Sequence, residues 1–103
     1  MQVISKARLK MFWEKHPAAE TPLAAWYKVA ENAEFTTFAE LRDVFGSADS
    51  VSKKEVRDGK PTKIKYIVFD IGGNNFRVIT TVNYISKRIY IREVLTHSEY
   101  DNW

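Results

Sequence analysis

The fold of this chain is decided by residues 63–84, which read KIKYIVFDIGGNNFRVITTVNY. Two runs rich in β-branched and aromatic residues flank Gly72-Gly73-Asn74, which can supply the positive φ angles of a tight hairpin. The pattern predicts one strand over 63–71 and another over 76–84. Ser86-Lys87 is the next turn signal, and it leads into a third strand over 88–95. We therefore expect three antiparallel strands connected as a meander.

Upstream of these strands, apolar residues recur with the period of helices. A short strand over 2–4 and three helices are predicted, followed by a polar connection over 47–62. The first helix is predicted to have its N-cap at Ser5 and to stop at His16-Pro17. The second begins at Thr21, with Pro22 at its first position. The third begins with a capping box of Thr37 and Glu40 and ends with Gly46 as a left-handed C-cap.

This order of elements indicates the α+β class. We expect N-terminal helices packed on one face of a small antiparallel sheet, with the other face partly open and a helical turn at the C-terminus. The 103 residues have room for a single domain spanning 1–103.

Composition excludes several classes of function. The chain has no cysteine, which excludes disulfides and thiol nucleophiles, and 45% hydrophobic residues suffice for a core. No apolar run is long enough to cross a membrane, and no signal peptide is recognisable, so a cytoplasmic protein is expected. Two distant histidines and scattered carboxylates give no metal-ligand spacing, and no phosphate-binding glycine loop is present. Chemistry without a metal or cofactor is favoured.

Positive charge is concentrated in one segment. The net charge is +3, and residues 53–65 hold six basic residues against Glu55 and Asp58, which leaves the rest of the chain at −1. Such a segment suits a polyanion, with nucleic acid the first candidate, although a solvated loop has the same composition. The candidate RNA-binding residues are Lys53, Lys54, Arg57, Lys60 and Lys63.

Arg77 lies among apolar residues of the second predicted strand and needs an anion if it is partly buried. Two sources stay open: an internal carboxylate such as Asp70 or Glu93, or a substrate phosphate. His97 and Tyr100 are spaced to share one side of the terminal helical turn, and both can move protons, with flanking cations expected to favour the tyrosine phenolate. A capping histidine and a half-buried tyrosine are the alternative.

Two longer stretches, 69–79 (FDIGGNNFRVI) and 89–101 (IYIREVLTHSEYD), resemble the HigB-type toxins of bacterial toxin–antitoxin pairs, which belong to the RelE-like superfamily. The N-terminal stretches VISK, FWEKHP and AWY are similar to members of the same family, so the likeness covers nearly the whole chain. The resemblance implies an endoribonuclease (mRNA interferase) that cleaves mRNA, usually in the translating ribosome. It also implies a helix-turn-helix antitoxin of the HigA type, with operator DNA contacted only through the toxin–antitoxin complex.

Position by position, the family's pattern places catalytic candidates at Arg77, Arg92, His97 and Tyr100, with Lys65 before the turn. Many relatives have a histidine where this chain has Glu93. Other RelE-like folds inhibit DNA gyrase without cleaving RNA, so a non-catalytic interaction module, or a degenerate toxin, is the alternative.

Overall fold

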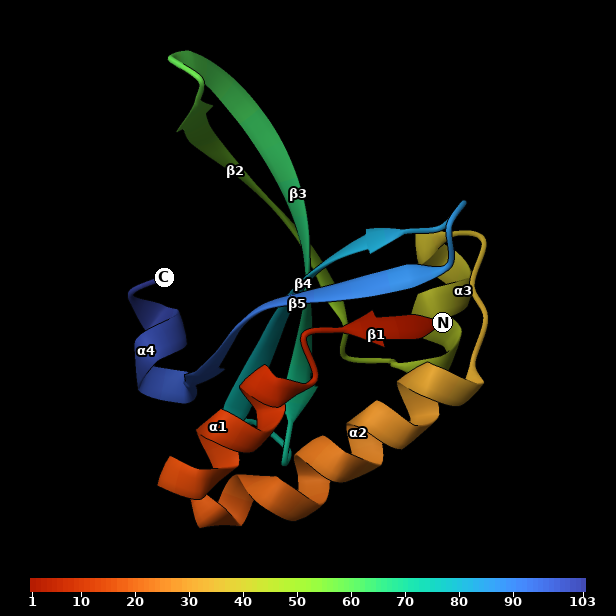
Figure 1. Cartoon of the computed structure of the whole chain (residues 1–103), viewed down its shortest axis with the longest axis vertical. Coiled ribbons are helices and arrows are strands. Elements are labelled where there is room, and N and C mark those ends of the chain that lie inside the picture. The colour runs from red at the N-terminus through yellow and green to blue at the C-terminus, as the bar shows by residue number, and fades with distance from the viewer.

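The computed structural model describes residues 1–103 and contains a five-stranded sheet with helices on both sides (Figure 1). The strands are β1 (Gln2–Ile4), β2 (Asp49–Arg57), β3 (Lys60–Ile71), β4 (Phe76–Asn83) and β5 (Arg88–Thr96). The helices are α1 (Ala7–Lys15), α2 (Glu20–Asn32), α3 (Phe38–Val44) and α4 (His97–Asp101), with a 3₁₀ turn over Pro17–Ala19. The α+β class is therefore confirmed.

The sheet has the order β1-β5-β4-β3-β2. Strands β3, β4 and β5 form the predicted antiparallel meander, and Gly72 and Gly73 both take positive φ angles in its first turn. The sheet is mixed rather than purely antiparallel, because β1 lies parallel to β5 at one edge. A parallel edge strand requires a crossover connection. Here α1 to α3 and strands β2 to β4 lie between β1 and β5 in sequence.

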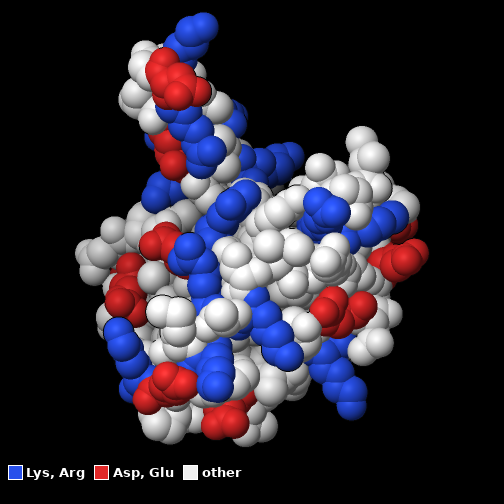
Figure 2. All heavy atoms as spheres, in the orientation of Figure 1, with Lys and Arg blue, Asp and Glu red and all other residues white.

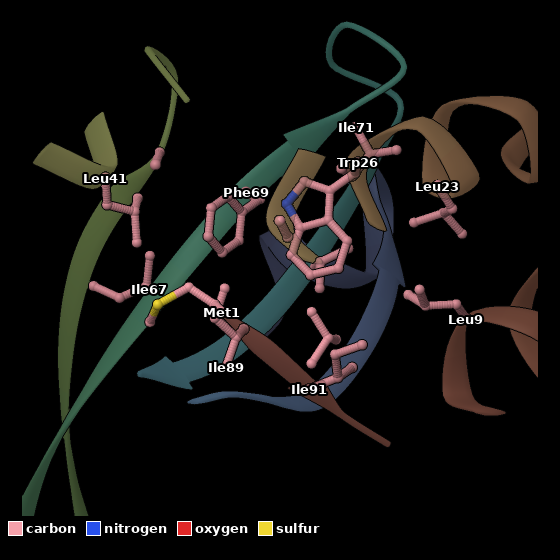
Figure 3. Packing of buried hydrophobic residues seen from close by; sticks show 14 of the residues in the cluster. Met1, Leu9, Leu23, Trp26, Leu41, Ile67, Phe69, Ile71, Ile89 and Ile91 are labelled. Carbon is pink, nitrogen blue, oxygen red and sulfur yellow. The ribbon is translucent and has the colours of Figure 1, made fainter. Parts of the chain in front are cut away.

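The main core lies between α1 to α3 and one face of the sheet. Trp26 of α2 contacts Phe69 of β3 edge-on, with ring centroids 5.1 Å apart, and Figure 3 shows side chains from helices and strands converging around this indole. Leu9 of α1 and Leu23 of α2 are fully buried in the same cluster. These helices cover the face that carries Ile67, Phe69 and Ile71.

The opposite sheet face is covered only in part, as expected. A small second cluster forms there from Tyr66, Val68 and Ile79, and it is closed by Tyr100 of α4 and by Trp103. The Trp103 ring contacts Tyr66 edge-on and stacks on Tyr100 with an interplanar angle of 21°. This contact docks the C-terminal residues against the sheet.

Residues 47–62 contain a strand, which corrects the predicted polar connection. Strand β2 pairs with β3 over its full length, from Asp49 opposite Val68 to Arg57 opposite Lys60, and the hairpin projects beyond the rest of the molecule (Figure 1). Its outer part is solvated on both faces, so the apolar alternation that normally marks a strand is missing there. The overlooked signal is Asp58-Gly59, whose positive φ angles of 52° and 75° form the turn.

Three helix-boundary predictions are also wrong. Ser5 is a turn residue with φ 72°, and Lys6 is the N-cap of α1. Helix α2 begins at Glu20, because the 3₁₀ turn starting at Pro17 runs directly into it and leaves Thr21 inside the first turn. Gly46 has no positive φ, and the C-cap of α3 is Phe45, which follows the last helical residue Val44.

The predicted cap of α3 is only half formed. The Thr37 side chain accepts the Glu40 N–H, as expected, but the Glu40 carboxylate binds the backbone N–H and hydroxyl of Thr36 instead of Thr37.

Candidate active site

The candidate site is built at the junction of β3, β4 and α4 on the partly open sheet face. Arg77 lies directly opposite Asp70 in the β3–β4 register and opposite Leu95 in the β4–β5 register. Strand β5 ends at Thr96 and α4 begins at His97, so the helix starts beside the arginine. The set of Arg77, His97 and Tyr100 is called the α4 site below.

Arg77 is only 6% exposed, and each of its N–H groups has an acceptor within the chain. Its Nε donates to Asp70 Oδ1 at 3.1 Å, so the internal carboxylate of the two alternatives is the one observed. Nη1 donates to the backbone oxygens of Asn74 and Phe76, at 3.1 and 3.0 Å, and Nη2 donates to Asn74 Oδ1 and faces His97 Nδ1 at 3.3 Å. The guanidinium therefore makes four contacts to oxygen atoms within the chain and a fifth to the imidazole, and in this structure it holds the site together.

Arg77 contacts both the histidine and the tyrosine. Its guanidinium carbon lies 5.2 Å from the centre of the Tyr100 ring, a cation–π contact, while its Nη2 approaches the imidazole. Because an arginine N–H can only donate, His97 Nδ1 is the acceptor and Nε2 carries the hydrogen. Nε2 lies 3.5 Å from Asp101 Oδ2, which orients the outer edge of the ring.

The environment of Tyr100 favours its phenol form. Burial raises the pKa of Tyr100, the charges of Asp49 and Asp70 raise it further, and Arg77 acts against them by lowering it. The expectation that flanking cations favour the phenolate is therefore wrong, because burial and two carboxylates outweigh one guanidinium. At neutral pH the side chain is a hydrogen-bond donor.

A reciprocal cap fixes the start of α4. The Thr96 hydroxyl accepts the Glu99 N–H at 3.1 Å, and the Glu99 carboxylate accepts the Thr96 N–H at 2.8 Å. These hydrogen bonds from Thr96 lower the pKa of Glu99. The sequence Thr-His-Ser-Glu carries this capping-box spacing, a signal that sequence reasoning did not use.

The other two catalytic candidates lie outside the α4 site. Side chains alternate along β3, so Lys65 faces away from Tyr66 and lies on the opposite sheet face from Arg77. Arg92 is on the open face, where its Nε donates to Thr81 Oγ1 at 2.9 Å and its guanidinium lies 5.1 Å from the Tyr90 ring. Its Nη groups make no hydrogen bond within the chain, so Arg92 has donors available.

The basic segment lies on the projecting hairpin, divided between its two faces. Lys53, Arg57 and Lys60 are on the open face, where Lys53 Nζ sits 3.8 Å from the Trp103 ring centre and Glu55 lies 3.9 Å from Arg57. The opposite face carries Lys54, Lys63 and Lys65 with no acidic partner, and we call these three residues the lysine face. Figure 2 shows basic side chains along the hairpin, interrupted by acidic ones near its tip.

No three histidine, aspartate or glutamate side chains come close enough to hold a metal ion. No helix has the length and apolar character needed to cross a membrane.

Comparison with known proteins identifies relatives over nearly the full length. The family model described as HigB_toxin, RelE-like toxic component of a toxin–antitoxin system, matches residues 19–103. The chain is 33% identical over 101 residues to an mRNA interferase HigB of Escherichia coli O6:H1, covering 98% of this chain and 89% of the relative. It is 36% identical over 101 residues to the mRNA interferase toxin HigB of Escherichia coli K12, covering 98% of this chain and 88% of the relative.

Proposed function

Because this chain belongs to the HigB family of RelE-like toxins, we propose that it is an endoribonuclease that cleaves mRNA. The family is the toxic component of a toxin–antitoxin system, so an antitoxin is its partner. We further propose that the mRNA is cut in the translating ribosome, which places the protein in the cytoplasm. The proposed antitoxin is a helix-turn-helix protein of the HigA type, through which alone the complex contacts operator DNA.

The observation that supports cleavage is the convergence of proton-transfer groups. Arg77 Nη2 lies 3.3 Å from His97 Nδ1, and the same guanidinium lies 5.2 Å from the centre of the Tyr100 ring. A module that only bound a partner would not require an imidazole and a phenol oriented by one buried arginine. General acid–base catalysis does require such a pair at a fixed separation.

The proposed reaction is attack of a ribose 2′-hydroxyl on the adjacent phosphate. The 2′-oxygen forms a bond to phosphorus, the bond to the 5′-oxygen breaks, and the products are a 2′,3′-cyclic phosphate and a 5′-hydroxyl. His97 Nδ1 takes the 2′-hydroxyl proton when the bound ribose replaces its contact with Arg77 Nη2, while Nε2 remains beside Asp101 Oδ2. Tyr100, held as a phenol, donates its proton to the leaving 5′-oxygen. No step in this scheme calls for a metal ion.

Arg77 and Arg92 have different roles in this scheme. Arg77 is a positioning residue, since its N–H groups are all engaged and it is 6% exposed. Arg92 contributes free Nη donors on the open face to the phosphoryl oxygens. Leu95 is the residue of β5 opposite Arg77. Arg92 precedes Leu95 by three residues, so their Cα atoms are about 10 Å apart along the strand.

RNA binding is proposed for the hairpin. Lysine attracts phosphate without regard to sequence, and Lys54, Lys63 and Lys65 have no acidic partner on their face. Lys65 is assigned here to RNA binding, because its face excludes it from the α4 site. Lys53, Arg57 and Lys60 provide the charge on the other side of the same hairpin.

Expression without antitoxin tests the proposal. Growth and mRNA 5′ ends within translated frames are compared for wild type, Tyr100→Phe and His97→Gln, with Ser98→Ala as the matched exposed control on α4. We expect arrest and new 5′ ends for wild type and the control, and intact transcripts for the two site variants. Arrest by wild type with intact transcripts would show a toxin that acts by binding a partner instead.

A further inference from the structure

A groove between α1 and α4 is not used by the proposed reaction. It has a volume of about 250 Å³, and one face of α1 forms its wall through Arg8, Met11, Phe12 and Lys15. These residues follow the i, i+3, i+4, i+7 spacing, so they share one side of the helix. The opposite wall includes Glu99 of α4. The groove therefore adjoins the helix that carries His97 and Tyr100.

The floor of the groove is apolar and aromatic. Phe12 packs against His16 with ring centroids 4.4 Å apart, and Val94 of β5 lies beside them. Met11 is 65% exposed and adds apolar surface to the wall of the groove. Phe12 is 8% exposed and also contacts Phe76, so a nucleobase in the groove meets the exposed edge of Phe12 together with the neighbouring His16 and Met11.

The rim of the groove is cationic at one side and anionic at the other. Arg8 and Lys15 are exposed and form no ion pair within the chain. Glu99 uses Oε1 in the cap of α4, while its Oε2 has no hydrogen bond or ion pair. Two free cations suit a phosphate, and a free carboxylate oxygen suits an amino group on a base edge.

We propose that this groove binds the nucleotide of the substrate strand that neighbours the cleaved bond. Its phosphate lies on Arg8 and Lys15, its base lies on Phe12, and its exocyclic amino group donates to Glu99 Oε2. The site prefers bases that carry such an amino group, and uracil carries none. This inference rests on the proposed function for its ligand class, because an RNA-cleaving site must also hold the flanking nucleotides.

His97 and Glu99 lie on nearly opposite sides of α4, close together along its axis. Glu99 follows His97 by two residues, so the two Cα atoms are separated by about 3 Å along the helix axis. Because an α-helix has 3.6 residues per turn, their side chains leave α4 in directions about 160° apart. One strand passing the end of α4 can place its reacting ribose at His97 and the next base in the groove.

Binding of RNA that cannot be cleaved tests the inference separately from the reaction. The probes are 2′-O-methylated hexamers of cytidine and of uridine, two pyrimidines that differ at the amino group, added to the full-length ¹⁵N-labelled protein. Dissociation constants are measured for wild type, Lys15→Glu and the matched control Lys10→Glu, which makes the same charge change on α1 outside the groove. Amide shifts of Arg8, Phe12 and Val94 report occupancy of the groove.

We expect groove shifts in wild type, tighter binding of cytidine than of uridine, and a loss of about tenfold in affinity for Lys15→Glu with little change for Lys10→Glu. Glu99→Gln, which retains a capping side chain, should reduce the preference for cytidine. Shifts confined to the hairpin, or wild-type affinity in Lys15→Glu, would overturn the proposal.

Loss of antitoxin binding by Lys15→Glu with unchanged RNA affinity would also overturn it, because the groove would then belong to a protein partner. The probe has no attacking hydroxyl, so failure of the cleavage proposal appears only in the mapping of 5′ ends. The two ideas can therefore fail independently.

Discussion

Replacing Arg77 by alanine should cost this protein stability as well as activity. The substitution removes a guanidinium that is 6% exposed and leaves the Asp70 carboxylate and the oxygens of Asn74 and Phe76 without their donor. Breaking a buried ion pair costs about 3–5 kcal/mol. The Asp70 side chain is 31% exposed and can regain water, so the lower end applies, about 3 kcal/mol.

Urea unfolding measures this loss. With a slope of about 2 kcal/mol per molar for a domain of this size, a change of 3 kcal/mol lowers the midpoint by about 1.5 M. Arg92→Ala is the matched control, because Arg92 is exposed and makes one side-chain hydrogen bond, to Thr81. Its midpoint should move by no more than about 0.5 M, the equivalent of about 1 kcal/mol.

Asp70→Asn completes a double-mutant cycle with Arg77→Ala. The two residues are in direct contact, so their effects should fall short of additivity by at least about 1 kcal/mol. A wild-type midpoint for Arg77→Ala together with complete loss of RNA cleavage would refute the reasoning. It would mean that the guanidinium acts on the substrate and contributes nothing to the fold.

Three further predictions concern α4 and the hairpin. Because the pKa of Tyr100 is raised, single-turnover cleavage should keep its phenol donor and decline only above the ordinary tyrosine pKa of about 10, and any residual cleavage by Tyr100→Phe should lack that decline. Thr96→Ala should cost about 1 kcal/mol in urea unfolding. In wild type, the cap's contribution to stability is present above about pH 4.3 and is lost as the pH falls through the lowered pKa of Glu99. Lys54→Glu removes a like-charge pair with Lys63 directly opposite, so it should stabilise the hairpin by about 0.2–1 kcal/mol. Fluorescence anisotropy measures the RNA affinity at several salt concentrations. Lys54→Glu should reduce the slope of log affinity against log salt concentration by about 0.7. An unchanged slope would show that the lysine face does not contact the RNA.

Local turn chemistry was readable from the sequence wherever a strong apolar pattern accompanied it. Gly72-Gly73 and the turn at Lys87 lie where they were predicted, because apolar strands flank both. Asp58-Gly59 is an equally good turn signal, but the strands beside it are polar on both faces. Their pairing depends on backbone hydrogen bonds that leave no periodicity in the sequence.

A contact within the site could be predicted from the sequence only where both partners lie in strands that the apolar pattern reveals. Asp70 is one of the two carboxylates that the sequence offers as partners for Arg77, and the structure pairs these two residues across neighbouring strands. The protonation of Tyr100 was not predictable, because Asp49 reaches it from a strand that the sequence did not reveal. The side of the sheet taken by Lys65 was equally hidden, since it depends on register.

The division of the hairpin into two faces changes how the basic segment has to be understood. Lys53 is engaged by Trp103, whose ring also packs on Tyr66 and Tyr100, so this lysine belongs to the structure that docks α4. The lysines of the opposite face have no such contact and are free to bind phosphate. If the proposed RNA binding holds, a single stretch of positive charge has two roles, because strand alternation places neighbouring lysines on opposite faces. Removing Lys53 should disturb α4, whereas changing Lys54, the next residue, should weaken RNA binding and leave α4 undisturbed.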